Sequence, residues 1–475
     1  MQRILLVRAN AWTPDTSMYS PPVGLLYLAA VLRERTGHAV EVFDDWQPAD
    51  LARRFDACLR RFRPTVVGIS ALTATAELLH RLAAQVKQTR PETLVVAGGA
   101  HATAWPADCL ADRNIDAVAV HEGEETLPRL VEALDRGQDL EGVPGLMRRG
   151  PSGSAESTGP AVFIEDLDAL PHPAYDLIDL PFYWRHRPMS PLGPIRSLPI
   201  LTSRGCPYPC TYCHQVMGKR FRARSVESVL DEIGWMCERH DIRALEVLDD
   251  AFNLDQDRAA RILEGIIARG YARRLKLRFP NGLRVDHLDE PLLDLLRAAG
   301  TDMLGLGIES GSARIQRQIG KPVDLARAER LIRYADRIGV LVAGYFMVGF
   351  PGETEADLRA TYEFALRSAL HQAMFFIVIP FPGTALHERH PAPHNAPARL
   401  SDYIYFRTSF NLSDVEDERF FALRRQALRR FYTSPRRLWR LWRTYPDPWH
   451  LPRYIPFMLR SFFSRSMSSG SPEPA

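Results

Sequence analysis

The chain has 475 residues, 46% of them hydrophobic and 25% charged, and this composition excludes disordered, collagen-like and coiled-coil proteins. Its length allows two to four domains, each with a full hydrophobic core. The net charge of +3 is unevenly distributed, because residues 421–465 carry eleven arginines against one acid. A nucleic-acid-binding protein would spread its basic surface more widely, so we expect no nucleic-acid partner.

Residues 1–140 alternate short β-branched runs with amphipathic stretches. The pattern predicts strands near 4–7, 39–43, 66–69, 94–97 and 117–120, and helices near 24–35, 49–61, 76–89, 104–111 and 125–135. Five such repeats are typical of an α/β domain with a doubly wound, flavodoxin-like parallel sheet, whose ligand site lies beyond the carboxyl ends of the strands. The first apolar run is brief and is interrupted by Arg8 and Asn10, so we do not interpret it as a signal peptide.

A second alternation occupies residues 196–385. It predicts strands near 199–202, 245–248, 275–279, 303–307, 342–348 and 375–379, and helices near 226–239, 257–269, 291–299, 325–338 and 355–370. Six βα units are too few for a closed eight-unit barrel, so we expect a partial barrel with its chemistry at the carboxyl ends of its strands. Between the two domains, residues 141–195 form a proline-rich linker, in which residues 149–160 are a loop by composition.

Residues 386–475 are predicted to form a mainly α-helical extension in which arginine is interleaved with tryptophan and phenylalanine. Four prolines between residues 446 and 456 prevent one long helix, and residues 466–475 are expected to be a disordered end. Two interpretations of the extension are open: a lid packed on the barrel mouth, or a basic aromatic surface resting on an anionic membrane. No apolar run is long enough to span a membrane, so we expect a cytoplasmic protein, with membrane association as the second option.

Three of the six cysteines, Cys206, Cys210 and Cys213, lie within eight residues on the loop that leaves the first barrel strand. The other three, at positions 58, 109 and 237, are scattered through predicted helices or their flanks. In a reducing compartment such clustering indicates a soft metal rather than disulfides. Structural zinc and ordinary iron-sulfur clusters both take four protein ligands, so a triplet leaves one position open. Zinc completed by His214 is the alternative.

The segment Arg204-Gly205-Cys206-x3-Cys210-x-Tyr212-Cys213 resembles the cluster motif of the radical S-adenosylmethionine superfamily, and the strand ends at residues 248–252, 305–312 and 349–354 fit the same resemblance. It implies a 4Fe-4S cluster on the three cysteines, with one open iron that is chelated by the amine and carboxylate of S-adenosylmethionine. Carboxylates suit the ammonium and ribose hydroxyls of this cofactor, and glycines, including Gly307, let the backbone approach it closely. The residues to which we assign cofactor contacts are Tyr212, Asp249, Asp250, Glu309, Ser310, Gly349 and Gly352.

Two further groups of polar residues in the second domain have two interpretations each. Arg278 and Asn281, after the third barrel strand, could reach the cofactor carboxylate or the substrate, while Arg278 could equally be a solvated surface charge. The basic residues after the cysteines are interpreted first as a solvated stretch, with attraction of an anionic substrate or reductant as the alternative. These residues are Lys219, Arg220, Arg222 and Arg224.

In the first domain, Ser70-Ala71-Leu72 ends the third predicted strand and Gly98-Gly99 ends the fourth, a spacing that resembles the S-x-L and G-G elements of cobalamin-binding domains. A doubly wound fold brings both elements to one crevice, where Ser70 can hydrogen-bond a nucleotide base and the glycines admit the tail. A degenerate fold without ligand is the alternative. The D-x-H-x-x-G element of methionine-synthase-like domains is absent, so we expect histidine-off binding with His101 beside the tail.

Residues 1–385 as a whole, including the segments 21–28 and 121–125, resemble the cobalamin-dependent radical S-adenosylmethionine proteins. The resemblance implies an enzyme in which a 5′-deoxyadenosyl radical abstracts hydrogen and methylcobalamin then methylates a small-molecule or lipid-like substrate, with an electron donor such as flavodoxin or ferredoxin. A cyclase or rearrangement enzyme of the anaerobic oxidative cyclase type is the alternative. A methylthiotransferase would need a second cysteine cluster that Cys58 and Cys109 cannot form, and a non-enzymatic cobalamin sensor would not need the triplet.

Overall fold

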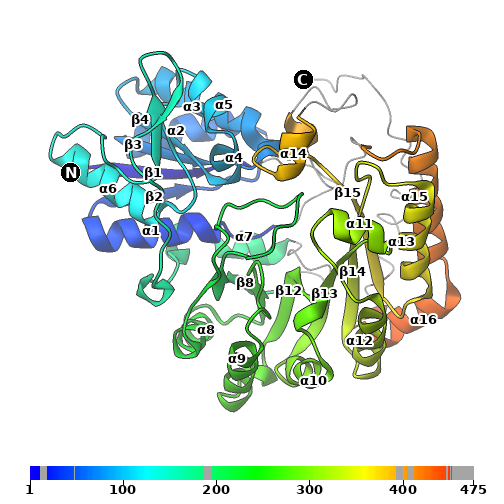
Figure 1. The fold of residues 1–475 in the computed structure, drawn as a ribbon. Helices are drawn as coiled ribbons and strands as arrows, with labels where there is room; N and C mark the ends of the chain where they lie inside the picture. Colours follow the sequence, from blue (N-terminus) through cyan, green and yellow to red (C-terminus); the bar gives the residue numbers. More distant parts are fainter. Residues whose placement is uncertain are drawn as a thin grey trace.

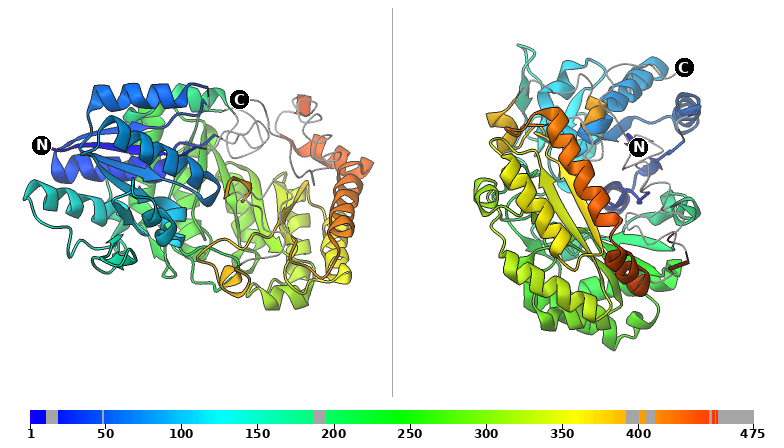
Figure 2. Two further views of the ribbon diagram at one scale, coloured as in Figure 1. Left: turned by 90° about the horizontal axis from the view of Figure 1, so that it is seen from above. Right: turned by 90° about the vertical axis from the view of Figure 1, so that its right-hand side faces the viewer.

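A computed structural model describes residues 1–10, 19–47, 49–186, 195–391, 400–403, 411–445, 448–449 and 451. Two α/β units follow one another along the chain and pack side by side, and the last helices cover the side of the second unit that is remote from the first (Figures 1 and 2). None of the helices in these residues is both long enough and apolar enough to cross a membrane.

The first unit is built on a sheet in the order β2-β1-β3-β4-β5-β6-β7, in which β1 to β5 run parallel. The strands are β1 (Arg3–Arg8), β2 (Ala39–Phe43), β3 (Val66–Ser70), β4 (Leu94–Gly98), β5 (Ala117–Ala119), β6 (Leu146–Arg149) and β7 (Ala155–Ser157). The helices are α1 (Val23–Thr36), α2 (Leu51–Phe62), α3 (Ala76–Thr89), α4 (Gly99–Ala104), α5 (Pro106–Ala111) and α6 (Gly123–Asp135). The doubly wound parallel sheet is thus confirmed.

One local expectation for the first unit was wrong, and one short helix was missed. The helix expected near residues 104–111 is α5, which starts at Pro106, and the missed helix is α4, which ends before this proline. The loop expected at residues 149–160 contains β7, which pairs antiparallel with β6 and extends the sheet beyond β5. Short polar strands at a sheet edge lack the apolar alternation that identifies a strand from sequence.

The segment after this hairpin contains only short elements: 3-10 turns at Leu167–Ala169 and Tyr175–Leu177, then α7 (Leu180–Arg185). Tyr175 is buried against the second unit, and its hydroxyl donates to the carbonyl oxygen of Pro199 at 2.9 Å. Ala174 packs in the core of the first unit instead, so the residues that join the two units contact both of them.

The second unit is a six-stranded parallel sheet in the order β15-β14-β13-β12-β11-β8, curved into a partial barrel with helices outside, as expected (Figure 1). Its strands are β8 (Ser197–Ile200), β11 (Ala244–Val247), β12 (Lys276–Leu283), β13 (Thr301–Glu309), β14 (Leu341–Val348) and β15 (Gln372–Ile377). Its helices are α8 (Val226–His240), α9 (Gln256–Ala268), α10 (Glu290–Ala298), α11 (Ala313–Gln318), α12 (Leu325–Arg337) and α13 (Glu355–Arg367). A separate antiparallel pair, β9 (Ser203–Arg204) and β10 (Arg222–Ala223), stands beside β8.

Local chemistry fixes where most of these helices begin. The residue before each of five helices has a side-chain oxygen that accepts a hydrogen bond from a backbone N–H of the first turn, which satisfies a donor that the helix itself cannot pair. These residues are Ser225, Asp255, Asp289, Asp324 and Thr354. Each βα turn thereby gains a defined geometry at the carboxyl end of its strand, where the site lies.

The extension consists of α14 (Ala385–Arg389), a 3-10 turn at Leu400–Asp402, α15 (Asp417–Tyr432) and α16 (Pro435–Thr444). Leu441 of α16 and Tyr445 pack against Met303 and Leu341, which lie at the amino ends of β13 and β14. A lid on the barrel mouth is therefore the wrong interpretation of α16, which covers the opposite end of the barrel. The expected disordered end at residues 466–475 lies outside the described residues.

Candidate functional site

The three clustered cysteines lie on one loop whose two ends are held together. The loop leaves β9 and returns at β10, where Arg222 pairs with Arg204 and Ala223 with Ser203. Gly205 has a φ of +82°, and a Cβ there would collide with the carbonyl oxygen of Arg220. Only glycine fits this narrow neck without strain, so the backbone fixes the start of the loop one residue before Cys206.

The thiols fit an iron-sulfur cluster better than a single zinc ion. Withdrawal from solvent and the neighbouring Cys210, Asp250 and Cys206 raise the pKa of the Cys213 thiol to about 11, so its thiolate needs a cationic partner. Tetrahedral zinc draws sulfur ligands to within about 3.8 Å of one another. In the described residues, neither the three cysteines nor His214 belongs to a group of three ligand atoms that all lie within 4.8 Å. The His214 ring instead contacts Phe381, with ring centroids 5.1 Å apart.

The two aspartates after β11 have different surroundings. The Asp249 carboxylate is buried and accepts hydrogen bonds from the Thr202 backbone N–H at 2.7 Å, the Thr202 hydroxyl at 2.5 Å and the Ser203 hydroxyl at 2.6 Å. These bonds occupy both of its oxygens, so Asp249 positions the entry to the cysteine loop rather than facing a cofactor. Asp250 is exposed and accepts only from the Gly205 N–H, at 3.2 Å, among the described residues. Asp250 remains available to a ligand.

Glu309 ends β13 in an unusual conformation. Its φ of +61° places a non-glycine residue in the left-handed region, a strain that concentrates at functional sites. Its carboxylate accepts a hydrogen bond from the Lys321 ammonium at 2.6 Å. Burial and this carboxylate raise the pKa of the Tyr212 phenol well above its usual value, so Tyr212 stays a neutral hydrogen-bond donor. Glu309, Lys321 and Tyr212 thus form one polar group beside Cys210.

Ser310 and the glycines after β14 are part of the same edge. The Ser310 hydroxyl lies 3.1 Å from the Thr361 hydroxyl and is buried, so its role is internal. Gly349 and Gly352 have φ values of +93° and +70°, and only Gly352 has open space where a side chain would be. Burial raises the pKa of Glu353 to about 8, although its carboxyl oxygen accepts the Gly349 N–H at 2.6 Å.

Arg222 and Arg224, which were expected to be solvated, are buried. Arg222 makes two hydrogen bonds to the Glu122 carboxylate, at 2.6 and 2.9 Å, and Arg204 binds Glu124 at 2.7 Å. Glu122 and Glu124 begin α6 of the first unit, so these ion pairs join the two units at the neck of the cysteine loop. Arg224 is likewise buried, paired with Glu232 of α8. The solvated interpretation holds for Arg220, which is largely exposed beside Glu165.

Arg278 is also buried, so it is not a surface charge. It lies on β12 with its Nε 3.6 Å from the Asp302 carboxylate. Asn281 donates to the Leu248 carbonyl oxygen at 2.7 Å and ties the end of β12 to the turn after β11. Among the described residues, neither side chain contacts the cysteine loop.

The S-x-L and G-G elements meet at the carboxyl ends of β3 and β4. Ser70 is opposite Gly98 in the parallel ladder, and a Cβ on Gly99 (φ +86°) would lie 2.6 Å from the Ser70 Oγ. The fold itself therefore already requires a glycine at position 99. At Gly98 the nearest atom to an added Cβ is the Ala119 carbonyl oxygen at 3.8 Å, so this residue leaves space for a tail. Leu72, which follows β3 at the same edge of the sheet, is 62% exposed.

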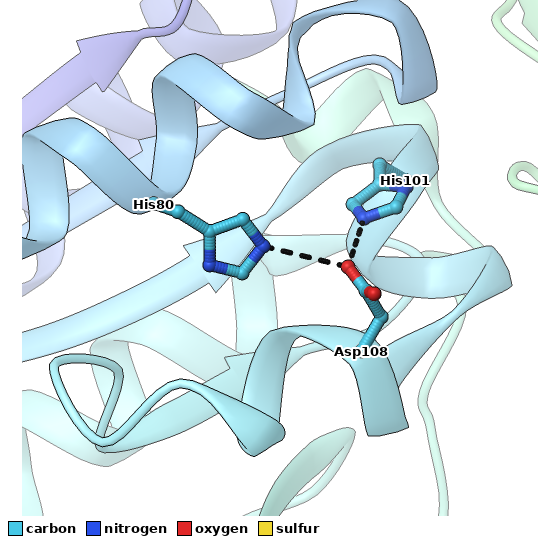
Figure 3. A group of neighbouring side chains, drawn as sticks. All are labelled: His80, His101 and Asp108. Atoms are coloured by element: carbon cyan, nitrogen blue, oxygen red, sulfur yellow. Dashed lines mark hydrogen bonds and ion pairs between the residues drawn. The ribbon is translucent and has the colours of Figure 1, made fainter. Parts of the chain in front are cut away.

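His101 points into the unit and away from solvent (Figure 3). Its Nε2 lies 3.0 Å from the Asp108 carboxylate, which also meets His80 Nε2 at 3.4 Å. The other nitrogen of His80 contacts Asp112 at 2.9 Å. Hydrogen bonds from His101 and His80 hold the pKa of Asp108 well below its usual range. This network fixes α4 to α3 and α5 and holds the His101 ring through Nε2.

The carboxyl ends of the two sheets face each other. Ala104 of α4 touches the loop before α14, since a Cβ on Gly383 would lie 3.1 Å from the Ala104 Cβ. Figure 1 shows α4 and α14 as neighbours, and the Trp105 and His387 rings are 6.4 Å apart. His121 Nδ1 lies 3.1 Å from the Val216 carbonyl oxygen of the cysteine loop. The crevice of the first unit and the loop of the second therefore open towards one shared region.

Comparison with known proteins agrees with this arrangement. The B12 binding domain model matches residues 16–131, and the Radical SAM superfamily model matches residues 200–365. An uncharacterized methyltransferase of Pyrococcus horikoshii is 32% identical over 425 residues, which cover 88% of each chain. The chain belongs to the cobalamin-dependent radical S-adenosylmethionine family. The anaerobic magnesium-protoporphyrin IX monomethyl ester cyclase of Rubrivivax gelatinosus is 27% identical over 80% of this chain and 68% of its own.

Among solved structures, the radical S-adenosylmethionine methyltransferase TsrM from Kitasatospora setae has the same fold, with a TM-score of 0.69 and 21% identity over 92% of this chain and 90% of its own. The 475-residue chain itself, as a cobalamin-dependent radical S-adenosylmethionine protein, is an enzyme whose cofactors are cobalamin, S-adenosylmethionine and a 4Fe-4S cluster. A non-enzymatic cobalamin sensor and a first domain without ligand are accordingly wrong. A second iron-sulfur cluster in the first unit would have two cysteines to bind it, Cys58 on α2 and Cys109, which is fully buried on α5.

Sequence reasoning missed Lys321 and the partners of the loop arginines. Lys321 follows α11 in a short polar turn, where nothing local distinguishes it from a surface lysine. Glu122 and Glu124 were noted only as part of a resembling segment, although two acids two residues apart at a helix start are also what an anchoring site for arginine requires.

Proposed function

We propose that this enzyme transfers a methyl group to a carbon atom of a small or lipid-like molecule. The observation that carries the proposal is that the carboxyl ends of the two sheets share one region, where α4 contacts the loop before α14 and His121 contacts the cysteine loop. When bound there, the cluster supplies the electron that cleaves S-adenosylmethionine, and cobalamin supplies a methyl group. The radical activates an inert C–H bond, so each cofactor gains its use from the other.

We assign the cluster to Cys206, Cys210 and Cys213. Asp250 and Glu309 suit the ammonium and ribose hydroxyls of S-adenosylmethionine, because both carboxylates lie beside the cysteine loop. The ion pair with Lys321, at 2.6 Å, keeps the Glu309 side chain in place. In this proposal Gly352 leaves open space for the cofactor, while Tyr212, Asp249, Ser310 and Gly349 shape its surroundings from the protein side.

For cobalamin, Gly98 and Leu72 border the space for the tail, and Ser70 is placed to hydrogen-bond it. His101 and Gly99 support this crevice from inside the protein, so binding is histidine-off. The proposed organisation is a cobalamin domain at 1–140, a linker at 141–195, a partial barrel at 196–385 and an extension at 386–475. A flavodoxin- or ferredoxin-type electron donor and a peripheral membrane contact through the extension complete the proposal.

The test uses S-adenosylmethionine labelled with deuterium in its methyl group, supplied anaerobically with the reconstituted enzyme, a reductant and candidate metabolites. Methyl transfer predicts a product that carries all three deuterium atoms of the labelled methyl group, with one 5′-deoxyadenosine and one S-adenosylhomocysteine formed for each transfer. A product formed with 5′-deoxyadenosine but with neither the label nor S-adenosylhomocysteine would refute methyl transfer and favour the cyclase or rearrangement alternative.

Cysteine variants separate the cluster from the rest of the fold. The triple substitution of Cys206, Cys210 and Cys213 by alanine should leave folding intact, because none of them belongs to a hydrophobic core cluster of the described residues, but should remove the bound iron and all 5′-deoxyadenosine. The matched control is Cys58→Ala on α2, which should keep the full iron and sulfide content. Stoichiometric zinc without a low-potential cluster signal in the unsubstituted enzyme would overturn the assignment.

A further inference from the structure

A surface hollow of about 400 Å³ lies between α12, the end of α13 and α16. Its charged lining consists of Arg330, Arg333, Arg337, Arg367, Arg440 and Asp336. Five guanidinium groups therefore surround one carboxylate, at a place remote from the cofactor crevice (Figure 1). Guanidinium groups present planar arrays of N–H donors that match phosphate oxygens, so a hollow of this composition favours phosphate-bearing ligands.

The acids nearby are already shared among several arginines. Asp336 lies 3.2 Å from Arg440 Nε and 2.5 Å from Arg443. Glu329 likewise forms ion pairs with Arg333, at 2.9 Å, and with Arg367, at 3.7 Å. In the part of the chain that the structure describes, Arg330 and Arg337 have no ion pair with a carboxylate. The hollow thus keeps a surplus of positive charge that the protein itself does not neutralise.

The α16 helix that forms one wall of the hollow also exposes large apolar side chains. Leu438, Trp439 and Trp442 are 45%, 60% and 50% exposed. At 3.6 residues per turn these three project from one sector of α16, and the basic positions 436, 440 and 443 project from the adjoining sector. The buried sector is separate, since Arg437 and Leu441 face the barrel. Aromatic and basic groups therefore occupy one outer face side by side.

We propose that the arginine hollow and the outer face of α16 dock on an anionic phospholipid bilayer. Lipid phosphates would occupy the hollow while Leu438, Trp439 and Trp442 enter the boundary between headgroups and acyl chains. A soluble phosphate would account for the arginines but not for three exposed apolar side chains on the adjoining surface. Each cationic side chain near such a membrane adds to an attraction that salt screens, so attachment through the hollow is salt-sensitive. This inference deepens the membrane contact of the proposed function and does not depend on the reaction catalysed.

The test is sedimentation of the full chain with vesicles of phosphatidylcholine alone or with about 30 mol% phosphatidylserine. We expect binding to the anionic vesicles only, weakened at least ~10-fold by Trp439→Ala with Trp442→Ala, and by Arg330→Glu with Arg337→Glu. The control with the same change in net charge is Arg53→Glu with Arg60→Glu on α2, whose side chains are 78% and 70% exposed. This control should bind within about twofold of the unsubstituted protein, apart from screened long-range attraction.

Three outcomes would overturn the inference. Equal binding to neutral and anionic vesicles excludes recognition of the anionic lipid by the arginines, and equal losses in the control variant reduce the effect to net charge. Displacement by millimolar inorganic phosphate, together with unchanged binding of the tryptophan variant, would make the hollow a site for soluble anions. Circular dichroism checks that each variant is folded, and 5′-deoxyadenosine formation in the absence of lipid reports separately on the proposed reaction.

Discussion

The buried ion pair between Arg222 and Glu122 should contribute several kcal/mol to the stability of the folded chain. The side chains of Glu122 and Arg222 are 1% and 3% exposed. The Glu122 carboxylate accepts two hydrogen bonds from Arg222 and one from the Ile164 N–H, and it lies 3.5 Å from Arg204. Glu122→Ala would leave the Arg222 guanidinium buried without a carboxylate partner, and removing one member of a buried pair costs about 3–5 kcal/mol.

The assay is urea unfolding of the reduced, cofactor-free chain, followed by circular dichroism and by tryptophan fluorescence. The matched control is Glu165→Ala, which breaks the largely exposed pair with Arg220 in the same loop and should cost less than about 1 kcal/mol. Replacing both partners, with Glu122→Leu and Arg222→Met, should recover much of the loss because no charge then stays buried. A loss in Glu122→Ala no larger than in Glu165→Ala would refute the reasoning.

Three further predictions concern single side chains. Gly98→Ala should keep wild-type stability but weaken cobalamin binding, whereas Gly99→Ala should lose more than about 1 kcal/mol of unfolding free energy because of its positive φ and the nearby Ser70 Oγ; equal stabilities would contradict this. His101→Ala should be destabilised, since it removes the bond to Asp108, with no loss of a nitrogen-ligand signal in the cobalt spectrum. The pKa of Glu353 is raised to about 8 in the folded chain, so unfolding between pH 4.5 and 8 releases a proton and the free energy of unfolding falls as pH rises, by at most ~1.4 kcal/mol per pH unit. Glu353→Gln should lack this fall when urea midpoints are compared at pH 5 and pH 8. The same pH dependence of the midpoint in both proteins would exclude the role of Glu353.

Periodicity alone determined most of the fold. Strands such as β3 and β14 are continuous apolar runs because parallel strands are covered on both faces, and the helices between them show one apolar side. The hairpin of β6 and β7 could not be found in this way, because its strands are short, polar and exposed on one edge. The spacing of Cys206, Cys210 and Cys213 on one loop was likewise a local property that needed no tertiary information.

Only the tertiary structure decided what each polar side chain meets. Arg220 and Arg222 are alike in sequence, yet one lies in solvent and the other is buried against Glu122, a residue one hundred positions away. Asp249 and Asp250 are neighbours in the turn after β11, but the Asp249 carboxylate accepts from Thr202 while the Asp250 carboxylate accepts from Gly205 at the start of the cysteine loop. Hydropathy and residue spacing report the period of an element and not its partners, since pairing between distant segments depends on how the two sheets pack against each other.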